Sequence, residues 1–321
     1  MHPSTLVILN PTSGRGTDPA EFSATVRESL PCRVALTQGE GDAARLAAEG
    51  VEAGATRIVA AGGDGTVRGV VEGMVRAGSD AASTPELGLI PLGTGNDLAR
   101  TVGIPLQLKR AVALLAASSA TRPLDLLRVT RDGSESWAAN AVVVGNGARL
   151  GTVLDSDDKT FWGPLSYLRS AVEVVVDLQP VSVLWQLDDE EARAFEVLNV
   201  VAANGAGAGR GVPIAPGADP FDGQLDAVMI ENAPSGQIVQ IGTALLAGGD
   251  ADAAAYHRRA ARRVRMESRQ GPLPVSIDGE PVEAEVLAVE LVAGRLRLVV
   301  EPDEGGTSFF GGRTSTDDSS S

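Results

Sequence analysis

Residues 56–66 read TRIVAAGGDGT, and this stretch decides the fold. Its first six residues predict a buried strand, and the glycine-rich turn GGDGT follows at once. Beyond the turn, apolar residues recur at the spacing of one helix face: Val67, Val70, Val71, Met74 and Val75. A strand, a tight glycine turn and a helix in this order indicate one unit of an α/β fold, with a parallel sheet covered on both faces.

The same alternation surrounds that unit. Strands are predicted at 5–9, 33–36 and 87–91, and helices at 19–30 and 42–53. Asp18 followed by Pro19 is a typical start for the first helix, because the aspartate caps it and the proline suits its first turn. A chain of 321 residues is long for one core, so we expect a second domain.

From about residue 124, strand-like runs follow one another and turn signals separate them. They lie at 124–130, 138–144, 181–187, 195–201, 225–231, 262–267, 274–277, 286–292 and 296–300. Two helices are predicted among them, at 164–178 and 235–247. We therefore expect an α/β domain at 1–123, a mainly antiparallel β-sandwich domain at 124–301, and a tail at 302–321 that partly packs back or is disordered.

Composition disfavours several classes of protein. The formal net charge of −15 argues against a nucleic-acid binder. The only lysines, Lys109 and Lys159, do not follow a glycine-rich loop, so the P-loop and protein-kinase lysine patterns are absent. The single cysteine, Cys32, fits a reducing compartment, and we expect a cytoplasmic protein. No apolar run reaches the length of a membrane span, and residues 1–10 predict a strand rather than a signal peptide.

Glycine-rich turns follow three predicted strands, at 10–16, 62–66 and 92–97. In an open parallel sheet, ligands bind beyond the carboxyl ends of the strands, where such turns lie. Glycine lets the backbone approach a phosphate closely, and the helix that follows presents N–H groups to an anion. Asp64 and Asp97 would repel an anion there unless a magnesium ion is included. The sequence therefore predicts a phosphate site with magnesium.

These turns carry motifs through which the chain resembles the diacylglycerol kinase catalytic-domain superfamily, in particular the bacterial soluble lipid kinases. The motifs are N-P-x-S-G at 10–14, G-G-D-G-T at 62–66, P-L-G-T-G-N-D-L-A-R at 91–100, G-x-L-x-Y at 163–167, D-G-x-L-D at 222–226 and D-G-E at 278–280. The resemblance covers about residues 4–300. It implies an α/β nucleotide-binding domain and a β-sandwich domain, with the active site in the cleft between them.

The resemblance also implies roles for the matching residues. The residues that contact ATP are Asn10, Pro11, Thr12, Ser13, Gly14, Thr37, Gly62, Gly63, Asp64, Gly65, Thr66, Val67 and Thr94. Asp64 and Asp97 position the catalytic Mg²⁺. Asp278 and Glu280 supply carboxylates near the acceptor hydroxyl, one of them as general base. The stretch 219–224 resembles a structural metal loop, with Asp219, Asp222 and Gln224 as ligands. An ordinary Asp-Gly turn is the alternative at 222 and at 278–280.

Together these features predict an ATP- and magnesium-dependent lipid kinase that moves the γ-phosphoryl group to the hydroxyl of diacylglycerol and gives phosphatidic acid. Sphingosine, ceramide and phosphatidylglycerol are alternative acceptors. An NAD kinase and a non-catalytic nucleotide-binding regulator are alternative functions. The glycine-rich run 204–211 is interpreted as a loop at the domain interface and not as a dinucleotide-binding turn.

A lipid substrate requires peripheral, transient contact with a membrane surface. Residues 257–269 are rich in arginine, and this basic run is the candidate for that contact. A solvated strand is the alternative. The arginines of the run are Arg258, Arg259, Arg262, Arg263, Arg265 and Arg269. The sequence leaves open whether the chain forms a homodimer.

Overall fold

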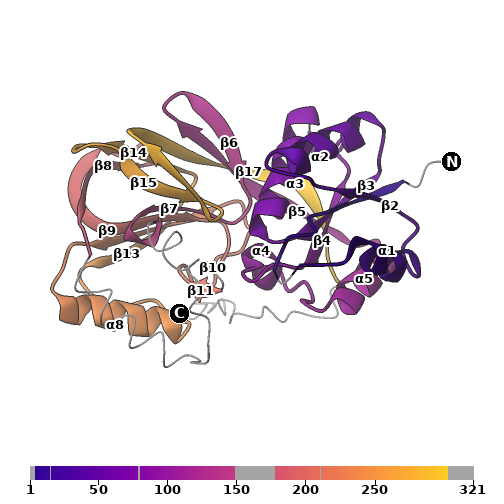
Figure 1. Ribbon diagram of the computed structural model, residues 1–321. Coiled ribbons are helices and arrows are strands. Elements are labelled where there is room, and N and C mark those ends of the chain that lie inside the picture. The colour runs from indigo at the N-terminus through magenta and orange to yellow at the C-terminus, as the bar shows by residue number, and fades with distance from the viewer. Residues whose placement is uncertain (1–3, 15, 79, 149–177, 210, 303–321) are drawn as a thin grey trace, which may run out of the picture.

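The computed structural model describes residues 4–14, 16–78, 80–148, 178–209 and 211–302. Figure 1 shows two parts side by side, an α/β part from the first third of the chain and a β-rich part from most of the remainder. The predicted helix at 164–178, except for its last residue, and the predicted tail from residue 303 onward lie outside the described residues.

The α/β part is a parallel sheet with helices on both faces. Its strands are β1 (Thr5–Leu9), β2 (Arg33–Leu36), β3 (Arg57–Gly62) and β4 (Glu86–Pro91), in the order β2-β1-β3-β4. Its helices are α1 (Pro19–Arg27), α2 (Asp42–Glu52), α3 (Asp64–Ala77), α4 (Asp97–Thr101) and α5 (Leu108–Ala117). Figure 1 shows α2 and α3 above the sheet and α1 and α5 below it. Because these strand pairs are parallel, their carboxyl ends meet at one edge.

Local sequence explains why these elements form. Asp18 caps α1, and its carboxylate accepts hydrogen bonds of 3.0 and 2.8 Å from the N–H groups of Ala20 and Glu21. Every residue of β1 is buried, as a strand covered on both faces requires. Four of the five predicted apolar positions of α3 are buried: Val70, Val71, Met74 and Val75.

The β-rich part is built from antiparallel strand pairs. Its strands are β5 (Thr121–Arg131), β6 (Ser134–Ala138), β7 (Ala141–Gly145), β8 (Val181–Leu187), β9 (Arg193–Ala203), β10 (Gly207–Ala208), β11 (Val212–Pro213), β12 (Leu225–Glu231), β13 (Tyr256–Ala261), β14 (Arg263–Ser268), β15 (Leu273–Ile277), β16 (Glu280–Ala284) and β17 (Val286–Val299). Helix α8 (Ser235–Leu246) packs Ile241 and Leu245 into one core with Val228 of β12 and Tyr256 of β13.

The long strand β17 joins the two parts. Most of it pairs antiparallel with β14 and β5, whereas Arg297 and Leu298 pair in parallel with Glu86 and Leu87 of β4. Strands of both parts therefore belong to one mixed sheet. This arrangement confirms the predicted α/β class, with a parallel first part and an antiparallel second part. The domain limits at 123/124 and 301/302 stay predictions.

The structure corrects several details. Of the predicted strand 138–144, residues 141–144 lie in β7 and only Ala138 lies in β6, because the N–H groups of residues 139 and 140, between the strands, donate to a carboxylate. The predicted strands 286–292 and 296–300 are the single strand β17, whose register shifts between Val292 and Leu296. Gly294 has a φ of 58° at this shift, a value that glycine adopts at low cost. Helix α5 and strands β13 and β16 are additional to the predicted elements.

Within the described residues, no helix has both the length and the hydropathy that a membrane span needs.

Candidate active site

The three glycine-rich turns meet at the carboxyl edge of the parallel sheet. Ser13 of the first turn accepts a 3.2 Å hydrogen bond from the backbone N–H of Gly63 in the second turn. A Cβ atom on Gly63 would lie 3.3 Å from the Cα atom of Gly93 in the third turn, and a Cβ atom on Gly14 would lie 2.3 Å from the carbonyl oxygen of Leu92. Glycine is needed at these positions because the three backbones touch.

The remaining predicted ATP contacts lie along the same edge. Asn10 follows β1; its side-chain oxygen accepts from the backbone N–H and hydroxyl of Thr12 at 3.1 and 2.8 Å, and its amide donates to Thr66 at 3.3 Å. Thr37 follows β2, and Thr94 is exposed in the third turn. Pro11 lies in the first turn, and Gly62, Gly65 and Val67 lie in the second turn or the first turn of α3. Because no side chain caps the N-terminus of α3, its first N–H groups can face an anion. Contact of these residues with ATP stays a prediction.

The carboxylate of Asp64 ties the second turn to the third. Its Oδ2 and Oδ1 atoms accept hydrogen bonds from the backbone N–H groups of Asn96, at 2.8 Å, and Asp97, at 2.7 Å. Asn96 holds a left-handed backbone with a φ of 54°, which turns both N–H groups toward Asp64. Burial, and then the charge of Asp97, raise the pKa of Asp64 to about 6. At neutral pH this carboxylate is therefore charged and short of positive partners.

Asp97 connects the α/β part to the β-rich part. It is buried at the start of α4, and its Oδ1 atom accepts a 2.6 Å hydrogen bond from the backbone N–H of Gly211. The N–H of Ala206 donates to the Thr101 hydroxyl at 3.2 Å. These contacts confirm that the glycine-rich run lies at the interface. The strands β10 and β11, rather than a helix, follow its first glycines, so it is not a dinucleotide-binding turn.

Asp278 lies in the turn between β15 and β16, on the β-rich side of the cleft. Its carboxylate accepts backbone hydrogen bonds from Ala139 at 2.7 Å, Asn140 at 3.0 Å and Ala141 at 2.9 Å. These bonds hold the backbone at the connection between β6 and β7, where the predicted strand 138–144 is interrupted at residues 139 and 140. Burial raises the pKa of Asp278 against their lowering effect. Asp278 is thus largely engaged in holding the backbone of its own part.

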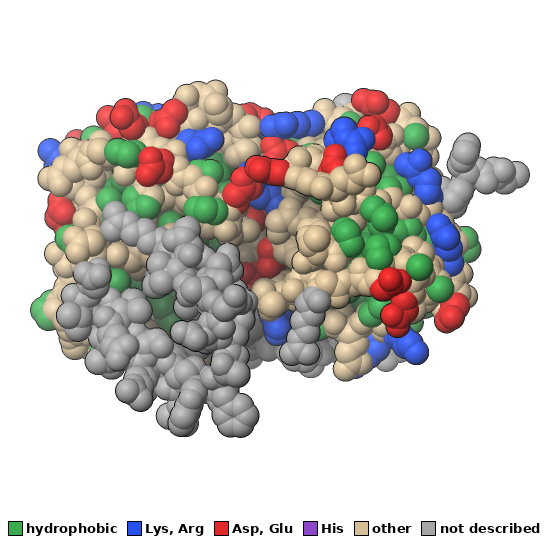
Figure 2. All heavy atoms as spheres, viewed as in Figure 1, with side chains coloured by type: hydrophobic (Ala, Val, Ile, Leu, Met, Phe, Trp, Pro, Cys, Tyr) green, Lys and Arg blue, Asp and Glu red, His purple; other side chains and the backbone are tan. Residues whose placement is uncertain are grey.

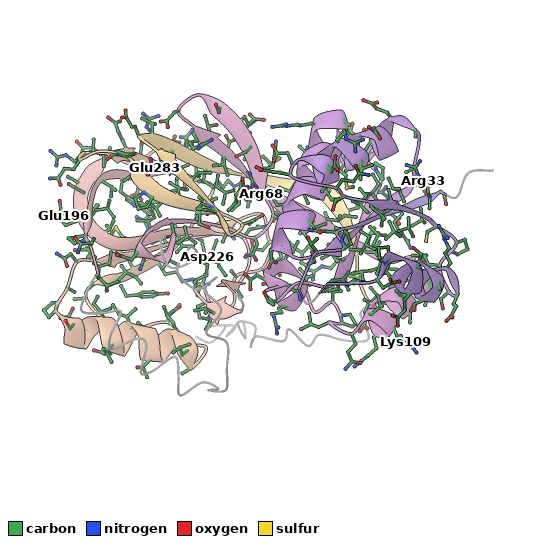
Figure 3. The ribbon with its side chains drawn as sticks, in the orientation of Figure 1. Arg33, Arg68, Lys109, Glu196, Asp226 and Glu283 are labelled. Atoms are coloured by element: carbon green, nitrogen blue, oxygen red, sulfur yellow. The ribbon has the colours of Figure 1, made fainter. Side chains whose placement is uncertain are left out.

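Glu280 is the more accessible of the two predicted acceptor-side acids. Its side chain is 49% exposed, and its carboxylate forms an ion pair with the guanidinium of Arg68 on α3. Figure 3 shows Arg68 at the junction of the two parts. Arg68, Asn96 and Gly211 are site residues additional to the prediction. Asn96 lies in the third glycine-rich turn and Gly211 ends the glycine-rich run 204–211, whereas the signal for Arg68 is its position one helical turn after Asp64.

The donor set fits a magnesium ion that is shared with a nucleotide. The charges of Asp97 and Asp278 both raise the pKa of Asp64, so the acids are close enough to repel one another. Figure 2 shows acidic side chains in the recess between the two parts. Across the ranges that the structure describes, no three acidic, histidine or cysteine side chains gather into a metal cluster. Magnesium is commonly bound by one or two carboxylates together with phosphate oxygens and water, which Asp64 and Asp97 could provide with ATP.

The 219–224 loop is arranged mainly by its own turn bonds. The carboxylate of Asp219 accepts from the N–H of Phe221 at 3.2 Å, and that of Asp222 accepts from the N–H of Gln224 at 2.9 Å. Burial, and then the nearby acids, raise the pKa of Asp222. The buried Asp125 accepts from Gly223 at 2.7 Å and anchors the loop. A metal at Asp219, Asp222 and Gln224 stays a prediction.

The basic run is largely neutralised. Arg258 is 9% exposed and pairs with Asp226 at 2.9 Å and with Asp250 at 2.8 Å. The prediction of a free basic surface is therefore wrong at this residue, which stabilises the fold instead. Three other arginines of the run also have acidic partners: Arg259 with Glu190, Arg263 with Asp189 and Arg265 with Glu267.

Comparison with known proteins places this architecture in a family. The model for the diacylglycerol kinase catalytic domain matches residues 4–129, and that for the YegS C-terminal NAD kinase beta sandwich-like domain matches residues 154–300. The chain is 33% identical to the "Probable lipid kinase YegS-like" of Xanthomonas euvesicatoria, covering 91% of this chain and 94% of that protein. The protein of the same name from Pseudomonas aeruginosa is 32% identical over 91% of this chain and 92% of its own length.

The fold also resembles solved structures. A crystal structure of a diacylglycerol kinase from Bacillus anthracis superposes with a TM-score of 0.69 at 20% identity, covering 93% of this chain and 97% of that one. A second structure from the same organism gives a TM-score of 0.76 at 23% identity, with 93% and 95% covered. At these identities the likeness supports the fold alone.

Proposed function

We propose that this chain, which belongs to the YegS-like family of probable lipid kinases, transfers the γ-phosphoryl group of ATP to the hydroxyl of diacylglycerol. The observation that carries the proposal is that Asp64 and Asp97, in two of the glycine-rich turns, lie opposite Asp278 and Glu280 across the cleft. Diacylglycerol is the proposed acceptor because the matched catalytic domain carries its name.

The α/β part supplies the nucleotide side of the reaction. The three touching turns and the N-terminus of α3 bind the triphosphate through backbone N–H groups and the hydroxyls of Ser13, Thr66 and Thr94. Asp64 and Asp97 would hold a magnesium ion, which would supply positive charge to the phosphate oxygens of the nucleotide. The hydrogen bonds from Asn96 and Asp97 fix the orientation of Asp64 before substrates arrive.

The β-rich part supplies the base. We assign this role to Glu280, because Asp278 accepts three backbone hydrogen bonds and has little capacity left for a substrate proton. Glu280 takes the proton of the acceptor hydroxyl while that oxygen forms its bond to the γ-phosphorus. The bond from the γ-phosphorus to the bridging oxygen breaks, and ADP leaves. Asp278 keeps the β6–β7 backbone in place behind the base.

The proposal is tested with labelled ATP and a panel of acceptors in mixed micelles. We expect label in phosphatidic acid when diacylglycerol is present with magnesium, and none with Asp64→Asn. Asp189→Asn is the matched control, because Asp189 is 97% exposed in the β8–β9 turn, away from the cleft. If label appears mainly in phosphorylated sphingosine, ceramide or phosphatidylglycerol, that lipid replaces diacylglycerol as the proposed acceptor. Label in NADP, formed from NAD, would overturn the lipid-kinase assignment.

A further inference from the structure

Arg68 is the cation that faces the acceptor-side acids of the cleft. It lies on α3, one turn after Asp64, and its side chain is 13% exposed although it is an arginine. Its guanidinium contacts the Glu280 carboxylate on β16, and its charge lowers the pKa of Asp278 in opposition to burial. One arginine of the nucleotide side thus acts on both acids of the opposite side.

The environment of Arg68 indicates that Glu280 is its principal partner. Within α3, the nearest acid is Glu72, whose carboxylate lies 3.9 Å from Nη2, at the limit of an ion pair. The buried Nε–H has no acceptor among the described residues. Glu72 is held more closely from its other side, by Arg76 at 2.5 Å. The position of Arg68 is therefore determined mainly by a contact that crosses the cleft.

We propose that Arg68 is a positioning residue: it holds Glu280 against the nucleotide-binding part, so that the base faces the acceptor hydroxyl. This inference rests on the proposed function, since it gives Glu280 the role of base. The exposed Glu280 side chain would otherwise sample many rotamers. The ion pair also connects α3, which begins at the phosphate site, to the β15–β16 turn.

A double-mutant cycle tests this role. Arg68→Gln is expected to lower kcat about tenfold while the KM for ATP changes less than about threefold, because the base is misplaced and the nucleotide turns are intact. Because Arg68 acts through Glu280, the double variant Arg68→Gln with Glu280→Gln should be no slower than Glu280→Gln alone, within about twofold. Arg68→Lys keeps the charge and should recover part of the loss.

Arg76→Gln is the matched control. It makes the same change on the same helix and removes the ion pair between the exposed Arg76 side chain and Glu72, but lies two turns further from the cleft. We expect its kcat to equal that of the wild type. A KM increase of tenfold or more with unchanged kcat for Arg68→Gln would indicate direct nucleotide binding and overturn the proposal. Additive losses in the double variant would overturn it too.

Hydrogen exchange separates this inference from the proposed function. The backbone N–H groups of residues 279, 280 and 282–284, in the β15–β16 turn and β16, should exchange faster in Arg68→Gln than in the wild type and in Arg76→Gln, whatever the substrate is. If the wild type phosphorylates no lipid but this difference is present, the proposed function fails and the Arg68 link stands. If the wild type is an active kinase and Arg68→Gln changes neither kcat nor exchange, only the Arg68 inference fails.

Discussion

The Asp97 carboxylate, in the nucleotide-binding part, accepts a 2.6 Å hydrogen bond from the backbone N–H of Gly211 in the β-rich part. The same carboxylate is one of the two proposed magnesium ligands. A carboxylate has about four lone-pair sites, so Asp97 can keep this hydrogen bond while it binds a metal, and the bond helps to fix its orientation. The two parts are therefore connected at the point where metal is proposed to bind.

This relationship predicts different outcomes for two substitutions of Asp97. Asp97→Asn keeps an oxygen for the Gly211 N–H, so the free energy of unfolding should fall by less than about 1 kcal/mol while kcat falls at least about a hundredfold. Asp97→Ala leaves that N–H without its partner and should cost about 1–3 kcal/mol as well. Chemical denaturation and kinase assays would check both. Equal stability of the two variants would contradict a structural role for this hydrogen bond.

A second prediction concerns pH and magnesium. The pKa of Asp64 is about 6 in the folded chain, above the ordinary aspartate value of 3.8, so the folded state binds this proton more tightly. Its contribution to the free energy of unfolding therefore falls as pH rises from about 4 to 6, by no more than about 3 kcal/mol, and is constant above that range.

Magnesium needs the ionised carboxylate of Asp64 and relieves the repulsion between Asp64 and Asp97. It should therefore raise Tm clearly at pH 7.5 and little at pH 5. Thermal scans with and without MgCl₂ check this. Asp64→Asn should lose most of the magnesium effect. A Tm increase that is independent of both pH and Asp64 would place the metal elsewhere.

The division of labour between Asp278 and Glu280 gives a third prediction. Asp278→Ala removes the acceptor for three backbone N–H groups and should lower the free energy of unfolding by on the order of 3 kcal/mol. Asp278→Asn should be milder, since asparagine tolerates the φ of 47° and keeps one acceptor oxygen. Glu280→Gln should leave stability within about 1 kcal/mol and lower kcat by about a hundredfold. A Glu280→Gln enzyme with wild-type kcat would return the role of base to Asp278.

A fourth prediction addresses the 219–224 loop. If Asp222 holds a structural metal, Asp222→Ala and treatment with a chelator should each lower Tm, and the two effects should not add, because both remove the same ion. Asp252→Ala, a substitution of an exposed acid, is the control. If the variant loses stability but the chelator does not affect the wild type, the loop is a turn held only by its hydrogen bonds.

The paired arginines make a fifth prediction. Arg258→Gln should destabilise the fold by about 3 kcal/mol or more, because it leaves the carboxylate of Asp226, which is only 8% exposed, without its partner. Arg262 and Arg269 are exposed, and replacing both with glutamine should leave Tm unchanged. If this surface contacts membranes, the double variant should have lower activity on anionic vesicles and unchanged activity on a short-chain diacylglycerol. Equal activity on both substrates would place membrane contact elsewhere.

The sequence by itself determined the α/β part and its phosphate edge. Strand, glycine turn and helix are local patterns, and parallel strands bring the ends of successive units to one edge whatever packs around them. Asp64 and Asp97 could be singled out for the same reason, because an acid within a phosphate-binding turn conflicts with its surroundings unless a cation is present.

Only the tertiary structure decided how the two parts meet. No local pattern shows that Asp278 accepts hydrogen bonds from three N–H groups at the β6–β7 connection, that β17 crosses from one part to the other, or that Arg68 reaches Glu280 from more than two hundred positions away in the chain. Arg258, Arg259 and Arg263 look like part of a basic surface in one dimension, yet Asp226, Glu190 and Asp189 are brought beside them only by folding. Charge pairing and carboxylate capping depend on distance in space, which sequence spacing does not encode beyond a helical turn or a strand pair.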